Sequence, residues 1–194
     1  MDADAEKMLR VRDGDIAGYG DLVRRYQGAL INFFYKLVWD RQEAEDFAQD
    51  VFVKVFVARA HYEEKSKFST YLFRVATNYW IDFLRTRGKR KKAASLDRDV
   101  QTADGTANLG QFIAAKTATP DDDLLRREQL ERTREAIDAL PEEQKLAFLL
   151  AEVQGMKYQE IAETLDLPLG TVKSRIHAAV LKLREQLAAK GIIG

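Results

Sequence analysis

The stretch from Tyr158 to Glu185, YQEIAETLDLPLGTVKSRIHAAVLKLRE, constrains the fold of this chain more than any other. Apolar residues recur there at three- and four-residue intervals on both sides of a proline, which predicts two helices joined by a tight turn. Pro168 cannot continue a helix interior, but it fits the first turn of a new helix. The small Ala162 would let the two helices cross closely. This stretch is therefore predicted to fold as a helix-turn-helix.

The second helix of this pair should turn a polar and basic face away from the core near its start. The residues expected on that face are Thr171, Lys173, Ser174, Arg175, His177 and Ala178. In a helix-turn-helix, the first turns of the second helix meet base edges in the major groove. Lysine and arginine can contact phosphates or guanine, and a small apolar side chain can lie against a thymine methyl. An ordinary helical hairpin with a solvated basic face is the alternative, and we favour DNA binding.

Charge is balanced over the whole chain but separated along it. Thirty-one basic and 31 acidic residues give a formal net charge of zero. A basic run, RTRGKRKK, spans residues 85–92, whereas acids gather at 43–50, 121–123 and 142–143. Local basic surfaces attract phosphate even when the totals cancel, and acidic surfaces favour a basic partner. The sequence therefore predicts two kinds of partner.

Several classes of site and location are excluded by residue usage. Cysteine is absent and only two histidines occur, which argues against disulfides, thiolate metal sites and histidine-based catalysis. No apolar run reaches the ~18 residues needed to cross a bilayer, and the first residues carry no cleavable signal. We expect no catalytic residues, no cofactor, no bound metal and no direct membrane insertion, and we expect a cytoplasmic protein.

The pattern of apolar residues predicts helices and no strands. Residues 1–13 should be frayed or form a short helix, and Asp40 should cap the start of a later helix. Further helices are expected over residues 15–38, 41–60, about 69–87, 124–140, and again from 141. The segment between the third and fourth of these helices is poor in apolar residues, as linkers are. The predicted fold is all-α, with two small helical domains (1–87 and 124–194) joined by a flexible linker (88–123).

The third predicted helix is unusually aromatic. Most of its aromatic residues fit a buried face, but cations and an amide are interleaved with them. Such a surface can hold unpaired bases by backbone charge, stacking and a base-edge contact. Asparagine has poor helix propensity, so Asn78 needs another reason to be there. We assign Asn78 and Trp80 to base contacts, together with the preceding loop at 65–68.

Four motifs in a fixed order carry a resemblance to a known family. They are AEDFAQDVFVKVF (44–56), FSTYLFRVATNYWIDFLR (68–85), LPEEQKLAFLL (140–150) and YQEIAETLDLPLGTVKSRI (158–176). Together they resemble the extracytoplasmic-function (ECF) sigma factors, group 4 of the primary-type bacterial sigma family. The resemblance implies that 1–87 is sigma region 2 and that 124–194 is sigma region 4. It also implies a specificity subunit that directs core RNA polymerase to promoters and helps to open them, with no chemistry of its own.

The resemblance assigns residues to three surfaces. Core polymerase would bind the helix that carries Asp46, Gln49, Asp50 and Lys54. The melted minus-ten strand would meet Lys65, Lys67, Phe68, Ser69, Thr70, Arg74, Asn78, Trp80 and Arg85. The duplex minus-thirty-five element would meet the six residues named above for the second helix of the hairpin. Ala178 departs from the longer side chain common in relatives, which bears on the base that is read.

The resemblance also implies partners and regulation. The partners would be core RNA polymerase, promoter DNA and an anti-sigma factor that clamps both domains, and the chain would be a monomer when free of them. Transcription would respond to stress or another signal. The linker would thread the active-site and RNA-exit channels of the polymerase.

Two rival functions remain open from the sequence. The first is a stand-alone helix-turn-helix regulator, although such proteins usually dimerise and read a two-fold repeat. The second is a helical, metal-dependent nuclease that uses Glu43, Glu45, Asp46 and Asp50. We favour neither, because these acids are expected on one exposed helical face rather than in a cleft.

Overall fold

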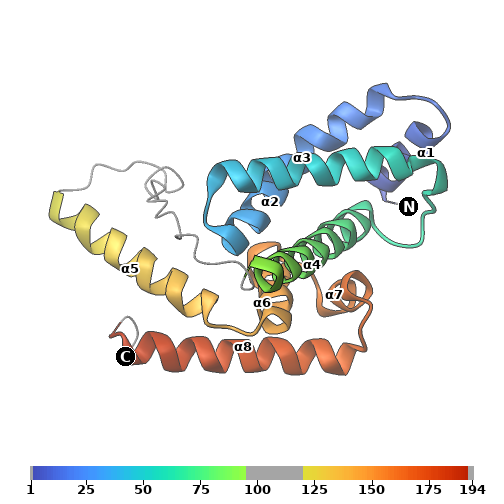
Figure 1. The fold of residues 1–194 in the computed structure, drawn as a ribbon. Helices are drawn as coiled ribbons and strands as arrows, with labels where there is room; N and C mark the ends of the chain where they lie inside the picture. Colours follow the sequence, from blue (N-terminus) through green and yellow to red (C-terminus); the bar gives the residue numbers. More distant parts are fainter. Residues whose placement is uncertain (1, 95–119, 192–194) are drawn as a thin grey trace.

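The computed structural model describes residues 2–94 and 120–191, with side chains at 2–87 and 129–191, and all its regular elements are helices (Figure 1). The N-terminal half contains α1 (Ala3–Arg12), α2 (Ala17–Val38), α3 (Arg41–Val57), the 3₁₀ turn η1 (Ala58–His61) and α4 (Phe68–Ala94). The C-terminal half contains α5 (Pro120–Asp138), α6 (Glu142–Phe148), the π-helical turn η3 (Leu149–Val153), α7 (Tyr158–Leu165) and α8 (Leu169–Ala189). The predicted all-α fold of two helical domains is confirmed.

The N-terminal domain is built on an aromatic core between α2, α3 and α4. Phe47 of α3 is central, because its ring lies 5.5 Å from that of Phe34 and 4.8 Å from that of Phe83 in edge-on contacts. Edge-on aromatic pairs are favoured by their ring charge distributions, beyond the area that they bury. Leu72 and Ala76 present the apolar stripe of α4 to this core, and both are fully buried.

The corner between α2 and α3 confirms one predicted cap and adds a strained residue. The backbone N–H of Glu43 donates to Asp40 Oδ1 at 2.8 Å, so Asp40 caps α3 as predicted. Trp39, just before it, has a φ of 57°, in the left-handed region that costs a bulky residue roughly 1–2 kcal/mol. Its buried ring packs on Tyr35 and its indole N–H donates to Asp138 of α5 at 2.9 Å. These contacts offset the backbone strain.

Helix α1 is a packed helix, which corresponds to the second of the two states expected for residues 1–13. Ala5, Met8 and Val11 are fully buried and lie at the three-residue spacing of one helix face. The Asp2 side chain accepts a hydrogen bond from the Phe68 backbone N–H at 2.8 Å, so it caps α4 from a distance of 66 residues in sequence. Arg12 donates to the Tyr62 carbonyl at 3.3 Å. Helix α1 therefore holds both ends of the loop between η1 and α4.

The C-terminal domain contains the predicted helix-turn-helix, which is confirmed as α7 and α8. Asp166 ends α7 in the left-handed conformation with a φ of 53°. Pro168 then stands directly before α8, where its missing N–H is not needed. Ile161 of α7 and Val172 of α8 are fully buried in the core of the hairpin.

Several helix ends differ from their predicted positions. Helix α3 ends at Val57 and the 3₁₀ turn η1 follows, three residues before the predicted end at 60. Helix α4 starts at Phe68 and continues to Ala94, and α5 starts at Pro120, so both helices enter the segment predicted as linker. Arginine and lysine are good helix formers, and proline followed by three aspartates suits a helix start. The rest of that segment, 95–119, lies outside the described residues, as does its predicted path through the polymerase.

Candidate nucleic-acid interface

The residues predicted for the minus-ten element fall into an exposed and a buried group. The exposed ones are Lys65, Lys67, Arg74, Asn78 and Arg85, and Ser69 is half-buried. The buried ones are Phe68, Thr70 and Trp80. In this arrangement of the chain, the side chains of Phe68, Thr70 and Trp80 are therefore not accessible to DNA, whereas the other six residues predicted for the minus-ten element are at least partly exposed.

Phe68 and Trp80 are buried because aromatic and interdomain contacts enclose them. Phe68 packs edge-on against Tyr26 at 5.3 Å, and Trp80 stacks on Phe83 at 5.5 Å. The indole N–H of Trp80 also donates to the Glu142 side chain of α6, and only 3% of the Trp80 surface is exposed. Neither ring offers a face to a base in this arrangement.

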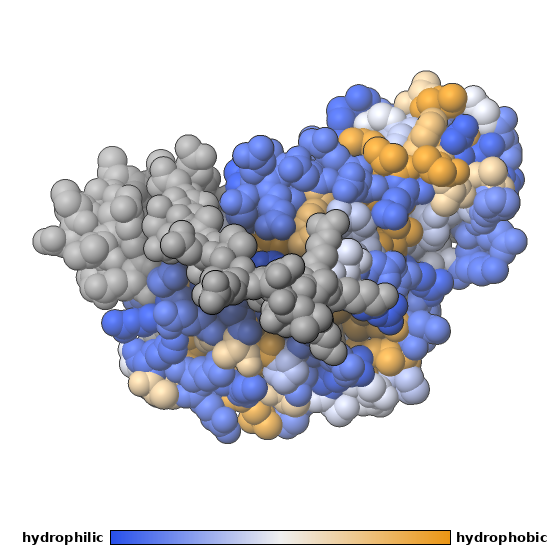
Figure 2. Space-filling model, viewed as in Figure 1, coloured by the Kyte–Doolittle hydropathy of each residue, from blue (hydrophilic) through white to orange (hydrophobic). Residues whose placement is uncertain are grey.

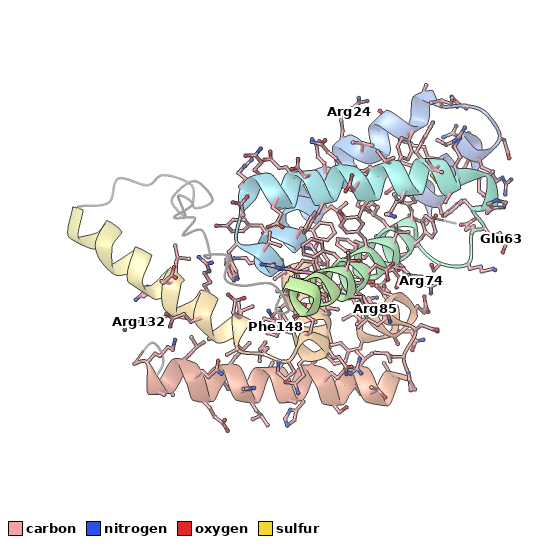
Figure 3. All side chains as sticks on the ribbon, in the orientation of Figure 1. Arg24, Glu63, Arg74, Arg85, Arg132 and Phe148 are labelled. Carbon is pink, nitrogen blue, oxygen red and sulfur yellow. The ribbon has the colours of Figure 1, made fainter. Side chains whose placement is uncertain are left out.

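Two cations of α4 and its preceding loop are bound by α7. Lys67 Nζ lies 2.6 Å from Glu160 Oε1, and Arg74 Nε donates to the Glu163 carbonyl at 3.1 Å. Figure 3 shows Arg74 on the side of α4 that lies against α7. The hydrogen bond that Lys67 donates to the Glu160 carboxylate raises the pKa of Lys67. Burial opposes ionisation of Glu160, but hydrogen bonds from Lys67 and from the Lys157 backbone outweigh it and lower the pKa of Glu160.

The six residues predicted for the minus-thirty-five element share the outward face of α8, and none of them is buried. Lys173, Ser174 and His177 are exposed, whereas Thr171, Arg175 and Ala178 are half-buried. Helix α8 lies along one edge of the molecule, away from α4 (Figure 1). The guanidinium of Arg175 pairs with Glu143 at the start of α6. This ion pair fixes one cation of the face, and the surface is otherwise open.

The four residues predicted to bind core polymerase, Asp46, Gln49, Asp50 and Lys54, are all exposed on α3. Tyr79 Oη donates to Asp50 Oδ2 at 2.7 Å, and Lys54 Nζ lies 5.8 Å from the centre of the same ring. Burial is the main cause that raises the pKa of Tyr79, followed by this hydrogen bond to Asp50. Tyr79 therefore stays protonated near neutral pH and holds Asp50 in place.

An apolar patch next to these residues was missed by the sequence interpretation. Val53 and Val57 of α3 are 61% and 71% exposed, and Ile16 at the start of α2 is 53% exposed. Figure 2 shows apolar surface over this end of the molecule, beside hydrophilic surface. We call Val53 and Val57, which lie one helix turn apart on the same face of α3, the apolar patch. The sequence contains the signal for this patch, because helix periodicity places both valines outside the stripe that α3 turns toward the core.

The acidic residues of α3 do not form a metal site. No group of three or more His, Asp or Glu side chains in the described residues is arranged to hold a metal ion. Glu43, Glu45, Asp46 and Asp50 all belong to the described part, and Glu45 is engaged by Arg41 at 2.7 Å. The arrangement of these four acids therefore does not support the nuclease hypothesis. In 2–94 and 120–191, no helix combines the length and apolar character that a membrane span requires.

Comparison with known proteins connects these surfaces to one family. A family model described as Sigma-70 region 2 matches residues 22–90, and one described as Sigma-70, region 4 matches residues 130–183. The ECF RNA polymerase sigma factor SigW of Bacillus subtilis is 32% identical over 182 residues, which cover 94% of this chain and 95% of the relative. The chain belongs to the ECF sigma factors.

Further relatives support this assignment along almost the whole chain. The RNA polymerase sigma-H factor of Pseudomonas aeruginosa is 33% identical over 92% of this chain and 91% of its own length. The ECF RNA polymerase sigma-E factor of Escherichia coli is 32% identical over 88% of this chain and 86% of its own length. These matches support the sigma factor reading rather than a stand-alone regulator.

Two solved structures share the fold. CnrH, solved in complex with the cytosolic domain of CnrY, has a TM-score of 0.70 and 23% identity, and it covers 97% of this chain and 99% of its own. The sigma factor RpoE of Bartonella quintana, solved with the anti-sigma factor NepR, has a TM-score of 0.67 and 23% identity over 88% of this chain and 96% of its own. At this identity, the two structures support the fold of this ECF sigma factor.

Proposed function

We propose that this ECF sigma factor directs core RNA polymerase to specific promoters and helps to open them, while catalysing no reaction itself. One observation carries the proposal. Both sigma regions match the chain, and each contains one of the two predicted DNA surfaces, on α4 and on α8. A chain with separate surfaces for a single strand and for a duplex fits promoter opening better than simple duplex binding.

We assign core polymerase to the exposed face of α3. Asp46 and Asp50 supply negative charge, and the neighbouring apolar patch supplies surface that is worth burying. Charged groups around an apolar centre steer the encounter, while the apolar centre provides most of the affinity. The partner surface should therefore be basic with an apolar centre.

We assign the minus-thirty-five duplex to α8 and the melted minus-ten strand to α4 with the loop before it. The outward face of α8 carries Lys173 for phosphate and His177 and Ala178 for base edges. The exposed Asn78 and the loop at 65–67 would receive a flipped base, whose capture offsets unstacking costs of a few kcal/mol. The burial of Thr70 and Trp80 means that this second surface has to be uncovered first.

We propose that an anti-sigma factor is the regulatory partner, and that the chain acts in the cytoplasm and is a monomer when free of partners. Two structures with the same fold were solved with protein partners, one of them described as an anti-sigma factor. The domain division at 87/88 and 123/124 belongs to the same proposal.

Run-off transcription tests the proposal. The purified chain would be added to sigma-free bacterial core polymerase with a genomic promoter library, and the start sites would be sequenced. We expect initiation that depends on the chain and that shares sequence at both promoter elements. A folded chain that gives no initiation but binds promoter duplex by itself would indicate the stand-alone regulator instead.

Variants locate the polymerase surface in the same assay. Asp50→Lys should abolish binding to core polymerase and therefore initiation, because it reverses charge at the centre of the α3 face. Glu185→Lys makes the same charge change on an exposed position of α8 and should initiate normally. Equal activity of the two variants would contradict the assignment of α3.

A further inference from the structure

The loop at 62–67, which joins η1 to α4, has little support from its own residues. Within these six described residues the backbone forms one hydrogen bond, from the Lys65 N–H to the Glu63 carbonyl at 2.9 Å. Most of the side chains between the two ends of the loop are exposed. A short exposed segment of this kind samples many conformations unless other elements fix it. Contacts that fix this loop therefore bear on whatever binds to it.

Helix α1 fixes the end of the loop that leads into α4. Phe68 is the first residue of α4, where backbone N–H groups have no acceptor within the helix. Lys67 stands directly before it and has no acceptor oxygen, so its side chain cannot cap α4. The Phe68 N–H donates instead to Asp2 Oδ2 at 2.8 Å. Asp2 is at the cap position of α1, yet its side chain makes no cap hydrogen bond to that helix.

Helix α1 also fixes the other end of the loop. Arg12 Nη1 donates to the Tyr62 carbonyl at 3.3 Å. The Asp13 carboxylate accepts from Nε and Nη2 of the same guanidinium at 2.8 and 3.3 Å, which sets the plane of that group. The Tyr62 ring is buried against Tyr71 of α4, with the ring centres 5.0 Å apart. The first residue of the loop is therefore held by α1 and α4 together.

Helix α1 is itself anchored by a buried carboxylate. Asp4 is 3% exposed, and it accepts from Tyr26 Oη at 2.6 Å and from Arg25 Nη1 at 3.1 Å. A buried carboxylate is stable where it is paired and hydrogen-bonded, so these contacts fix α1 on α2. The Tyr26 ring also lies 5.3 Å from the ring of Phe68 in an edge-on contact. The group that anchors α1 therefore supports the first residue of α4 as well.

These contacts lie outside the part of the domain that the family model matches. That match covers residues 22–90, whereas α1 spans Ala3–Arg12 and its cap residue is Asp2. None of the residues predicted for the minus-ten element belongs to α1. A binding site is nevertheless only as precise as the residues that hold its contact residues in place.

We propose that Asp2 and Arg12 are positioning residues for the flipped base of the minus-ten strand. They hold the two ends of the loop at 62–67 in the conformation that receives the base, and they act through the loop rather than on the base. This inference rests on the proposed function, which assigns the flipped base to this loop. A loop that is already fixed loses less conformational freedom on binding, so affinity for the flipped base should depend on α1.

An abasic scan tests the proposal with the full-length chain bound to core polymerase. The DNA is a pre-melted promoter from the run-off experiment, in which one nucleotide at a time of the non-template minus-ten strand lacks its base. The parent chain should bind about tenfold more weakly when the flipped base is missing, as expected for the loss of one stacked base. Asp2→Ala should bind the intact strand about fivefold more weakly than the parent chain, but the strand without that base equally well.

Two variants separate the hydrogen bond of Asp2 from its charge. Asp2→Asn loses the charge but keeps an acceptor oxygen for the Phe68 N–H, so it should behave like the parent chain. Glu6→Ala removes one negative charge from an exposed position of α1 and should also behave like the parent chain. General destabilisation would weaken binding to both DNAs, whereas a positioning role weakens binding only where the base is present.

Arg12→Ala tests the other end of the loop. It should lose affinity for the intact strand beyond any loss that it shows on the strand without the flipped base. Arg10→Ala removes the same charge from an exposed position of α1 and should affect both DNAs equally. All of these variants should bind core polymerase as the parent chain does, because the exposed face of α3 is unchanged.

The outcomes are distinct. Equal losses on the two DNAs for Asp2→Ala, or no loss on either, would overturn the positioning role. Failure of Asp2→Asn to restore binding would assign the effect to charge and would also overturn it. A parent chain that initiates transcription, but has no position sensitive to base removal, would overturn the inference and leave promoter-directed initiation in place. Absence of initiation by the parent chain would refute the proposed function, and the inference with it.

Discussion

The two predicted DNA surfaces differ in how they are presented, although each is one face of a helix with interleaved cations. The face of α8 is open, and its cations meet solvent or a neighbour within the same domain. The face of α4 is partly covered, and two of the cations predicted for it, Lys67 and Arg74, meet the other domain. The difference means that the residues predicted for the duplex are accessible in this arrangement of the chain, whereas part of the surface predicted for the single strand is covered.

Trp80→Ala should have the largest effect on stability, because Trp80 contacts Phe83 in its own domain and Glu142 in the other domain. Truncation of a buried tryptophan costs about 3–5 kcal/mol of unfolding free energy, since it leaves a cavity among Phe47 and Phe83. Urea unfolding followed by circular dichroism measures this loss. His177→Ala on the open face of α8 should change stability by less than about 0.5 kcal/mol.

Trp80→Phe sharpens this comparison, because it keeps a ring in the core and removes only the indole N–H. It should cost far less stability than Trp80→Ala while still removing the hydrogen bond to the Glu142 side chain. If Trp80→Ala were as stable as His177→Ala, the covered face would not depend on this contact and the contrast between the two surfaces would fail.

Arg175→Ala tests the open face with the next largest effect. Loss of an arginine contact to a base edge typically costs about 1–3 kcal/mol of discrimination, so use of the minus-thirty-five element should fall. Stability should change by less than about 1 kcal/mol, because the ion pair with Glu143 lies at the surface. Competition binding with mutated promoter duplexes measures the first quantity, and thermal unfolding the second. Unchanged discrimination would remove Arg175 from the recognition surface.

The sequence predicted side-chain exposure better for the face of α8 than for the face of α4, for a physical reason. Helix periodicity places Lys173 and His177 on the side of α8 opposite Val172 and Ile176, and nothing else in the described residues covers that side. The same reasoning places Thr70 and Arg74 on an outward stripe of α4. It cannot show that a helix about 90 residues later in the chain packs on this stripe, because that packing depends on tertiary contacts alone.

Three other differences concern Trp80, Asp2 and the exposed valines of α3. Trp80 was assigned to bases because it falls beside the main apolar stripe, and only the position of Glu142 shows that its indole faces the other domain. The role of Asp2 could not be foreseen, since it caps a helix that begins 66 residues later. Val53 and Val57 were visible as apolar residues off the buried stripe of α3. The sequence was therefore sufficient to predict that these two valines form an exposed apolar surface.

Asp2→Ala tests whether the Asp2 cap stabilises the start of α4, and it should lower stability moderately. Loss of a helix cap costs about 1 kcal/mol, and here it would also release the loop that leads into α4. Hydrogen exchange at the amides of Phe68 and Ser69 should become faster, with exchange in α8 unchanged. Asp2→Asn keeps an acceptor oxygen and should retain most of the protection. Faster exchange in both helices would point to general destabilisation instead.

Acidification should produce the smallest effect, and it should act on the covered face through Glu160. Because the pKa of Glu160 is lowered, its contribution to the contact between α7 and Lys67 is complete above the ordinary value of 4.5 and is lost as the pH falls through the lowered value. The pKa of Lys67 is raised, so its contribution is complete below 10.5 and is lost only as the pH rises through the raised value.

The contact between α7 and Lys67 should therefore be constant between about pH 5 and pH 10 and weaken below that window. The chain has no cysteine, so spin labels on cysteines introduced at the exposed Ala60 and Ala188 can report the distance between the two domains. These distances should stay short from pH 8 to about pH 5 and lengthen on further acidification. Glu160→Gln cannot ionise but keeps an acceptor for the Lys157 backbone, so its distances should not change over the same range. If the distances in the parent chain were already long at neutral pH, another group would control the contact between α7 and α4. The contrast between the two faces would then need a different cause.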